Sequence, residues 1–217
     1  MTANIRQRGL FISFEGIDGS GKSTQIKMLF DYLNKKNKNA LVVREPGGTS
    51  ISEEIRDILL RNRNQNLSSR TESLLMTASR NQLVNEIIIP KLKEGVIIIA
   101  DRFADSTLAY QGGGRGINID WLDKLNKFAT HNISPDITFY LDILPEEGIK
   151  RNISKTNDRF ENAGLKFQNK VRNEYLKILE LFPNRIKKIN GMQKSSIVHK
   201  QILDFIYNNN YEDFKLK

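Results

Sequence analysis

Residues 16–23, GIDGSGKS, carry the pattern that most constrains this chain: two glycines separated by four residues, then Lys and Ser. Glycines at 16, 19 and 21 allow the backbone to turn its N–H groups inward around an anion. In such a loop Lys22 reaches the β- and γ-phosphates of a nucleoside triphosphate, and the Ser23 hydroxyl can hold Mg²⁺. The pattern therefore predicts a site for a nucleoside triphosphate with Mg²⁺.

The segments on either side of this loop fit a phosphate site. Residues 10–14 form an apolar run typical of a buried strand, and residues 23–36 carry an apolar stripe at helical spacing. A helix that begins at the loop adds its positive N-terminal end to the anion site. This context favours a phosphate site over the alternative, a glycine-rich turn without a ligand.

Composition excludes several other kinds of chemistry. The chain of 217 residues has no cysteine and only two histidines, in unrelated segments, which argues against disulfides, a cysteine nucleophile, a His-rich metal site and a Ser-His-Asp triad. Its length suits one domain, 1–217. The N-terminus lacks the apolar run of a signal peptide, and residues 96–100, the longest apolar run, cannot span a bilayer. We therefore expect a cytoplasmic protein with no membrane partner.

The formal net charge of +9, from 34 basic and 25 acidic residues, has two interpretations. It could indicate nucleic-acid binding, or a solvated surface combined with a polyphosphate site. No basic run is interleaved with aromatic residues, as single-strand binders require. We therefore favour the second interpretation and expect no nucleic-acid partner.

Short apolar runs alternate with helical patterns, which predicts an α/β fold with a parallel sheet covered by helices on both faces. The predicted strands are residues 10–14, 40–44, 96–100, 137–142 and 185–189. The predicted helices are residues 23–36, 50–61, 70–94, 120–131, 145–155, 167–182 and 195–208. Ser69 and Glu72 have the spacing of a capping box at the start of the third helix. Residues 156–165 read as a loop and 209–217 as a C-terminal tail.

Three predicted strand ends carry residues suited to chemistry, at 15–23, 44–49 and 101–102. In open parallel sheets ligands bind beyond the carboxyl ends of the strands, so these segments should meet in one cleft. Asp101 ends an apolar strand, where an acid can hold Mg²⁺ directly or through water.

Residues 101–115, DRFADSTLAYQGGGR, together with EPGGT at 45–49 and LLMTASR at 74–80, resemble thymidylate kinases of the bacterial type. The likeness runs from the first strand to the last helix. It implies a P-loop NTPase-like, three-layer αβα fold with a five-stranded parallel sheet and a short lid at 151–165. It also implies transfer of the γ-phosphoryl group of ATP to dTMP with Mg²⁺, and a homodimer.

The resemblance implies a role for each residue of the motifs. The ATP-binding positions are Gly16, Ile17, Asp18, Gly19, Ser20, Gly21, Lys22, Ser23 and Thr24, with Gln193 near adenine. Around dTMP, Arg56 and Arg102 would bind the phosphate, Asp18 the deoxyribose 3′-OH, and Tyr110 the sugar. The base would be read by Arg80, Thr107 and Gln111, and Glu45, Pro46 and Ser106 complete the acceptor site. A tight turn at Glu45-Pro46 is a place where the family fits a cis bond.

This chain departs from the family pattern at two positions. Relatives commonly place Phe four residues before the base-reading Arg, where this chain has Met76, on the same helix face as Arg80. Some relatives, including the human type, carry Arg at the position of Gly19, whereas the bacterial type supplies it from the lid. Arg151 and Arg159, with Lys155 between them, are the candidates for that catalytic cation.

Three alternative functions follow from the same features. The first is another nucleoside monophosphate or deoxynucleoside kinase, against which Arg80 and the segment YQGGGR argue. The second is a GTPase switch, which lacks support because Asn126-Lys127 is followed by Phe-Ala rather than by the guanine-reading motif. The third, a basic nucleic-acid-binding module, rests on net charge alone.

Overall fold

The computed structural model describes residues 8–61, 67–152, 164–209 and 211. Its centre is a parallel sheet of five strands in the order β2-β3-β1-β4-β5. The strands are β1 (Phe11–Glu15), β2 (Ala40–Arg44), β3 (Ile97–Asp101), β4 (Ile137–Asp142) and β5 (Ile186–Asn190). Each lies within one residue of its predicted range, because each is a short apolar run bounded by polar or turn residues.

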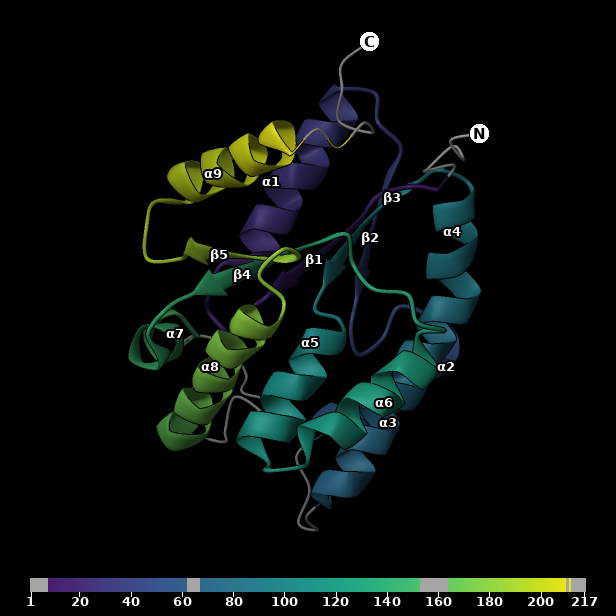
Figure 1. The fold of residues 1–217 in the computed structure, drawn as a ribbon, viewed down its shortest axis with the longest axis vertical. Helices are drawn as coiled ribbons and strands as arrows, with labels where there is room; N and C mark the ends of the chain where they lie inside the picture. Colours follow the sequence, from purple (N-terminus) through teal and green to yellow (C-terminus); the bar gives the residue numbers. More distant parts are fainter. Residues whose placement is uncertain (1–7, 62–66, 153–163, 210, 212–217) are drawn as a thin grey trace.

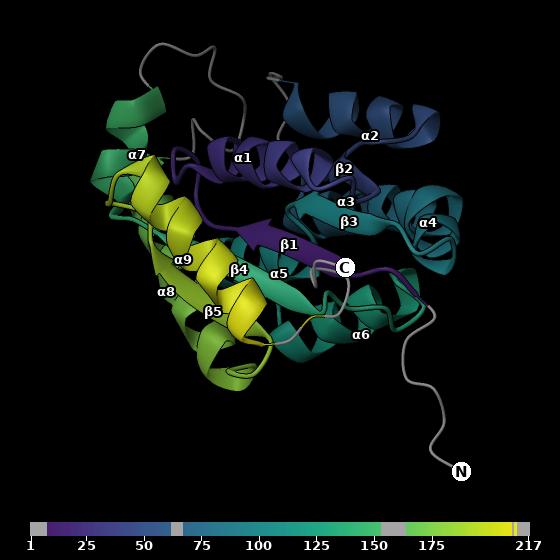
Figure 2. The ribbon, with the colours of Figure 1, turned by 90° about the horizontal axis from the view of Figure 1, so that it is seen from above.

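Helices α1 (Lys22–Lys35) and α9 (Ser195–Asn208) cover one face of the sheet. Figure 1 shows them on the opposite side of the strands from α5 and α8, and Figure 2 shows β1 between the two helical layers. Ile12 and Phe14 of β1 pack with Leu29 of α1 and Ile202 of α9. Alternate strand residues point to opposite faces, so these side chains form a core separate from the two clusters on the other face.

The opposite face of the sheet is covered by helices that carry most of the predicted acceptor residues. They are α3 (Ser69–Leu83), η1 (Val84–Ile88), α4 (Ile89–Lys93), α5 (Ala104–Thr107), η2 (Leu108–Gly114), α6 (Ile119–Ala129) and α8 (Gly164–Leu181). Phe11 and Ile98 pack here against α3 and η1, and Tyr140 packs against α8 and η2. These layers confirm the predicted three-layer αβα architecture.

The predicted helix at 70–94 is three consecutive elements, α3, η1 and α4. Pro90 lies in the first turn of α4, where its missing N–H and its ring would break an uninterrupted α-helix. The wider π-turn of η1 directly before it accommodates the proline. The predicted capping box is wrong: the N-cap is Ser68, whose Oγ accepts from the N–H of Thr71 at 3.1 Å, and Glu72 points inward.

Two helices complete the description around the sheet. α2 (Ser50–Leu60) packs against α3 and has Thr49 as its N-cap. α7 (Pro145–Asn152) begins at Pro145, and only the ends of the predicted lid at 151–165 belong to the described residues. α9 ends at Asn208 as predicted, although Tyr211 of the predicted tail packs against the α1 and α9 core. In the part of the chain that the structure describes, no helix has the length and apolar character needed to cross a bilayer.

Candidate active site

A cavity of about 610 Å³ lies beyond the carboxyl ends of β1, β2 and β3. Its lining includes Asp18–Gln25 of the glycine-rich loop, residues from the ends of β2 and β3, and residues of α2, α3, α5 and η2. All three predicted strand-end segments therefore contribute to one cavity. Gly16 and Ile17 do not line it, and Arg159 lies outside the described residues.

The glycine-rich loop has the backbone that its sequence predicts. Gly16, Gly19 and Gly21 have φ values of 141°, 77° and 96°, a region that side-chain-bearing residues rarely adopt. Lys22 Nζ donates to the carbonyls of Gly16 at 3.0 Å and Ile17 at 3.1 Å. Burial, together with the charge of Arg102, lowers the pKa of Lys22 to about 8. Gly16 and Ile17 therefore act on the site by holding Lys22 in place.

Ser23 and Asp101 are the pair predicted to hold Mg²⁺. Ser23 Oγ lies 3.4 Å from Asp101 Oδ2, at the edge of the loop and within the same cavity. Mg²⁺ prefers oxygen ligands and usually takes one or two from the protein, with phosphate and water oxygens completing an octahedron. Two adjacent oxygens beside a phosphate loop fit that requirement, whereas the described residues contain no cluster of three acidic, His or Cys side chains that could hold a metal alone.

Arg102 links the end of β3 to the glycine-rich loop. Its guanidinium donates to Asp18 Oδ1 at 2.6 Å and to the Gly16 carbonyl at 2.9 Å, and lies 4.9 Å from the centre of the Tyr110 ring. Its φ of 72° is unusual for a residue with a side chain and costs roughly 1 kcal/mol or more. This strained backbone directs the guanidinium into the cavity between the two predicted nucleotide sites.

Glu15, the last residue of β1, holds the segment after Arg102, a role that the sequence analysis missed. Its carboxylate is wholly buried and accepts from the Phe103 N–H at 2.7 Å, Ser106 Oγ at 2.6 Å and Tyr175 Oη at 2.7 Å. Burial, and then the charge of Asp105, raise the pKa of Glu15 to about 7. An acid at the end of an apolar strand was the available signal, and it applies to Glu15 as well as to Asp101.

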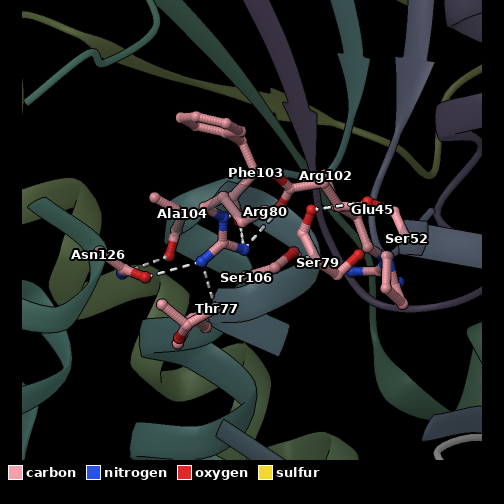
Figure 3. A network of polar contacts seen from close by, with 12 residues as sticks. Glu45, Ser52, Thr77, Ser79, Arg80, Arg102, Phe103, Ala104, Ser106 and Asn126 are labelled. Carbon is pink, nitrogen blue, oxygen red and sulfur yellow. Dashed lines mark hydrogen bonds and ion pairs between the residues drawn. The ribbon is translucent and has the colours of Figure 1, made fainter. Parts of the chain in front are cut away.

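Arg80 is almost completely buried and has a protein partner for each of its five N–H groups. Nε and Nη2 donate to Glu45 Oε2 at 2.8 and 2.6 Å, and Nη2 also donates to the Phe103 carbonyl at 3.1 Å. Nη1 donates to Thr107 Oγ1 at 2.8 Å and Asn126 Oδ1 at 2.7 Å. Figure 3 shows the guanidinium between Glu45 and Asn126. To contact a base, Arg80 would therefore have to share one of these bonds.

Glu45 and Arg80 form a buried ion pair in the wall of the cavity. Burial raises the pKa of Glu45, and the charge and hydrogen bonds of Arg80 oppose that rise. The Glu45-Pro46 bond is cis, as expected, and the Pro46 carbonyl accepts from Arg56 Nη1 at 2.7 Å. This hydrogen bond holds Arg56, which also lines the cavity.

The remaining predicted acceptor residues also belong to the cavity wall. Met76, Ser106, Thr107, Tyr110 and Gln111 all line it, together with Leu60, which the sequence analysis did not single out. Met76 is partly buried and packs against the cluster that contains Tyr110. This wall therefore combines apolar groups with a few polar ones, as is usual where a protein binds a planar ring.

Arg151 of α7 lines the cavity beside the glycine-rich loop. Its guanidinium donates to the Gly19 carbonyl at 3.2 Å, to the Gly191 carbonyl at 3.2 Å and to Glu147 at 3.0 Å. A Cβ atom on Gly19 would lie 2.5 Å from the carbonyl oxygen of Gly148 on the same helix. Gln193 also lines the cavity, and its Oε1 accepts from Gln201. The structure thus brings Arg151 to the loop.

Comparison with known proteins agrees with this arrangement. Residues 14–202 match the family model described as thymidylate kinase. A thymidylate kinase of Thermoanaerobacter sp. (strain X514) is 50% identical over 199 residues, which are 92% of this chain and 98% of that protein. One of Clostridium novyi (strain NT) is 49% identical over 203 residues, covering 92% and 98%. The crystal structure of thymidylate kinase from Ehrlichia chaffeensis matches with a TM-score of 0.77 and 34% identity over 92% of this chain and 99% of that one. The chain therefore belongs to the thymidylate kinase family.

Proposed function

We propose that this protein transfers the γ-phosphoryl group of ATP to dTMP, which yields dTDP and ADP. One observation supports the proposal beyond family membership: a single cavity joins the glycine-rich loop to a wall that combines Arg56 with apolar and polar side chains. Lys22 lies in the loop part of the cavity. Arg56 belongs to the other wall, together with Met76 and Gln111. Two nucleotides in this cavity would meet beside Arg102.

The reaction needs cations more than it needs a base. An oxygen of the dTMP phosphate, already anionic near neutral pH, attacks the γ-phosphorus, and the bond to the oxygen bridging the β- and γ-phosphates breaks. The transition state is loose and spreads its charge over the equatorial oxygens. Lys22, Arg102 and Arg151 all line the cavity and would stabilise that charge and align the two phosphates.

Mg²⁺ would be held by Ser23 and, directly or through water, by Asp101. When bound it neutralises charge between the β- and γ-phosphates. The 3.4 Å separation of the two side-chain oxygens supports this assignment.

For dTMP, we assign the phosphate to Arg56 and Arg102, the sugar to Asp18 and Tyr110, and the base to Met76, Thr107 and Gln111. The support is their common place in the cavity wall. Arg80 would hold the wall through Glu45 and Thr107 and share one donor with the base. Gln193 would lie beside adenine.

A steady-state assay with dTMP, dUMP, dCMP and AMP as acceptors tests the function. We expect dTMP to give the highest kcat/KM with ATP and Mg²⁺. A clear preference for AMP or dCMP would support the alternative, another nucleoside monophosphate kinase.

We also propose a homodimer and a cytoplasmic location, which the family resemblance supports. Large apolar side chains are exposed on two helices that contact each other: Leu74 on α3 at 52%, and Trp121 and Phe128 on α6 at 43% and 80%. A second copy packed on this surface would cover them. Light scattering of the protein should give twice the chain mass, and Phe128→Asp should shift it toward the monomer. A monomeric mass for the unmodified protein at micromolar concentration would overturn the dimer.

A further inference from the structure

Glu72 of α3 is a wholly buried acid that does not line the cavity but contacts a residue that does. Its Oε1 accepts from Gln111 Nε2 at 2.8 Å. Arg115 approaches the same carboxylate, with Nη2 3.3 Å from Oε2, and its guanidinium lies 4.5 Å from the centre of the Phe167 ring. Arg115 Nε also donates to Oε1 at 3.3 Å, so the Glu72 carboxylate has both a cation and the amide of Gln111 as partners.

This contact determines which end of the Gln111 amide can face the cavity. An ionised carboxylate has only acceptors, so the group of Gln111 that faces Glu72 must be the NH₂ donor. The amide oxygen, on the other arm of the same planar group, is then the end available to a ligand. Gln111 is buried and belongs to the cavity wall, so a base in the acceptor site would meet an acceptor there.

Bases differ in what they present to such an acceptor. Thymine and uracil carry an N–H at N3, whereas cytosine has an unprotonated N3 that can only accept a hydrogen bond. A buried acceptor placed against another acceptor leaves both groups unpaired, and sites of this kind reject the wrong ligand strongly. The orientation of one amide would therefore distinguish thymine from cytosine.

We propose that Glu72 is a positioning residue for base selection: it holds Gln111 Nε2 and so presents Gln111 Oε1 to the N3–H of thymine. This inference rests on the proposed dTMP kinase function. Arg80 is less suited to distinguish thymine from cytosine, because all five of its N–H groups already donate to protein acceptors. Glu72 acts only through Gln111, and its removal should change the choice of base more than the rate of transfer.

The Glu72→Gln variant tests the proposal, because a neutral amide can accept or donate and no longer dictates the orientation of Gln111. We measure kcat/KM for dTMP, dUMP and dCMP. The ratio of dTMP to dCMP should fall by about tenfold or more, while the ratio of dTMP to dUMP stays unchanged. Glu72→Asp keeps an acceptor-only side chain and should keep the dTMP to dCMP ratio. Glu86→Gln, an exposed acid in η1, is the matched control and should alter neither ratio.

Two results would overturn the positioning role: an unchanged dTMP to dCMP ratio in folded Glu72→Gln, or an equal loss for all three acceptors. In Glu72→Gln the partly buried Arg115 loses its anionic partner, which can prevent folding. In that case the double variant Glu72→Gln/Arg115→Gln removes this cation as well, and the same kcat/KM ratios are measured on it. Failure of the unmodified protein to prefer dTMP over dCMP would instead contradict the proposed function, so the two failures are distinguishable.

Discussion

Arg102 Nη2 and Asp18 Oδ1 form an ion pair of 2.6 Å that joins the end of β3 to the glycine-rich loop. Both side chains are partly exposed toward the cavity, at 16% and 28%. Asp18 therefore holds the guanidinium at the boundary between the donor and acceptor sites before either nucleotide binds. A preorganised cation loses less conformational freedom when charge develops beside it.

Arg102→Ala should reduce kcat/KM for dTMP by at least about 100-fold, because it removes the cation between the two phosphates. Arg102→Lys keeps a charge without the planar fork and should retain part of the activity. A coupled steady-state assay measures both, and circular dichroism checks the fold. Near-normal turnover in Arg102→Ala would contradict its assigned role.

Lys22→Ala should likewise lower kcat/KM for dTMP by about 100-fold or more, while the protein remains folded. Lys22 reaches into the cavity, whereas Lys27 on the same helix is exposed and pairs with Asp31 at 2.8 Å. Lys27→Ala is therefore the matched control and should leave kcat/KM unchanged. Comparable activity in the two variants would show that Lys22 does not contact the phosphates.

Met76→Phe should lower KM for dTMP or leave it unchanged, because an aromatic ring at this wall stacks on a base more firmly than a thioether does. Met76→Ala should raise KM, since it removes apolar contact from the same wall. Initial-rate measurements over a range of dTMP concentrations give both values. A large loss of affinity and stability in Met76→Phe would identify Met76 as a tightly packed core residue.

Glu15 should make stability depend on pH. An acid whose pKa is raised from 4.5 to about 7 in the folded protein stabilises it fully below pH 4.5 and loses that contribution as pH rises through 7. Between pH 5 and 8 the unmodified protein should therefore lose up to about 3 kcal/mol of unfolding free energy relative to Glu15→Gln. Urea denaturation at several pH values measures the difference. Parallel pH profiles for the two proteins would refute the buried, protonated state.

Gly19→Ala should destabilise the protein and lower activity more than Gly95→Ala. Both glycines have a φ of 77°, but an added Cβ meets the Gly148 carbonyl oxygen at 2.5 Å in the first case and nothing within 4 Å in the second. The left-handed conformation alone costs roughly 1–2 kcal/mol, so Gly95→Ala measures that cost. Thermal melts compare the two variants. Equal destabilisation would mean that Gly19 and Gly148 have room to separate.

Most of the sheet could be predicted from the sequence, but the segment at 104–114 could not. Each strand is a short apolar run bounded by polar or turn residues, so the local sequence pattern is enough to predict it. Residues 112–114 are three glycines in a π-helix, and their helical form depends on partners far along the chain. Gly113 lies against Glu174 and Gly114 against Phe167, both on α8. A Cβ atom at either glycine would come within 2.4 or 2.5 Å of these side chains, so only glycine fits there.

The site residues divide in a similar way. Residues in the motifs line the cavity because strand ends of a parallel sheet converge, which sequence order predicts. The spacing of Glu72 from Ser69 satisfies the local rule for a capping box, so the sequence predicts a cap there although Glu72 points inward. Yet Glu72, Met76 and Arg80 recur every four residues on one helix face, and that spacing indicates a residue directed toward the site. The four residues that accept the five hydrogen bonds of Arg80 lie in distant segments, so the local sequence around Arg80 does not reveal them.

The contact between Gly19 and α7 makes an arginine at position 19 incompatible with the observed place of Arg151. The family resemblance implies a transition-state cation either at position 19 or in the lid, and Arg151 is a candidate for the second. An arginine at position 19 would have to push away the backbone of Gly148, and with it the helix that brings Arg151 to the Gly19 carbonyl. Adding the first cation would displace the second, so exchanging one design for the other requires two coordinated changes rather than one.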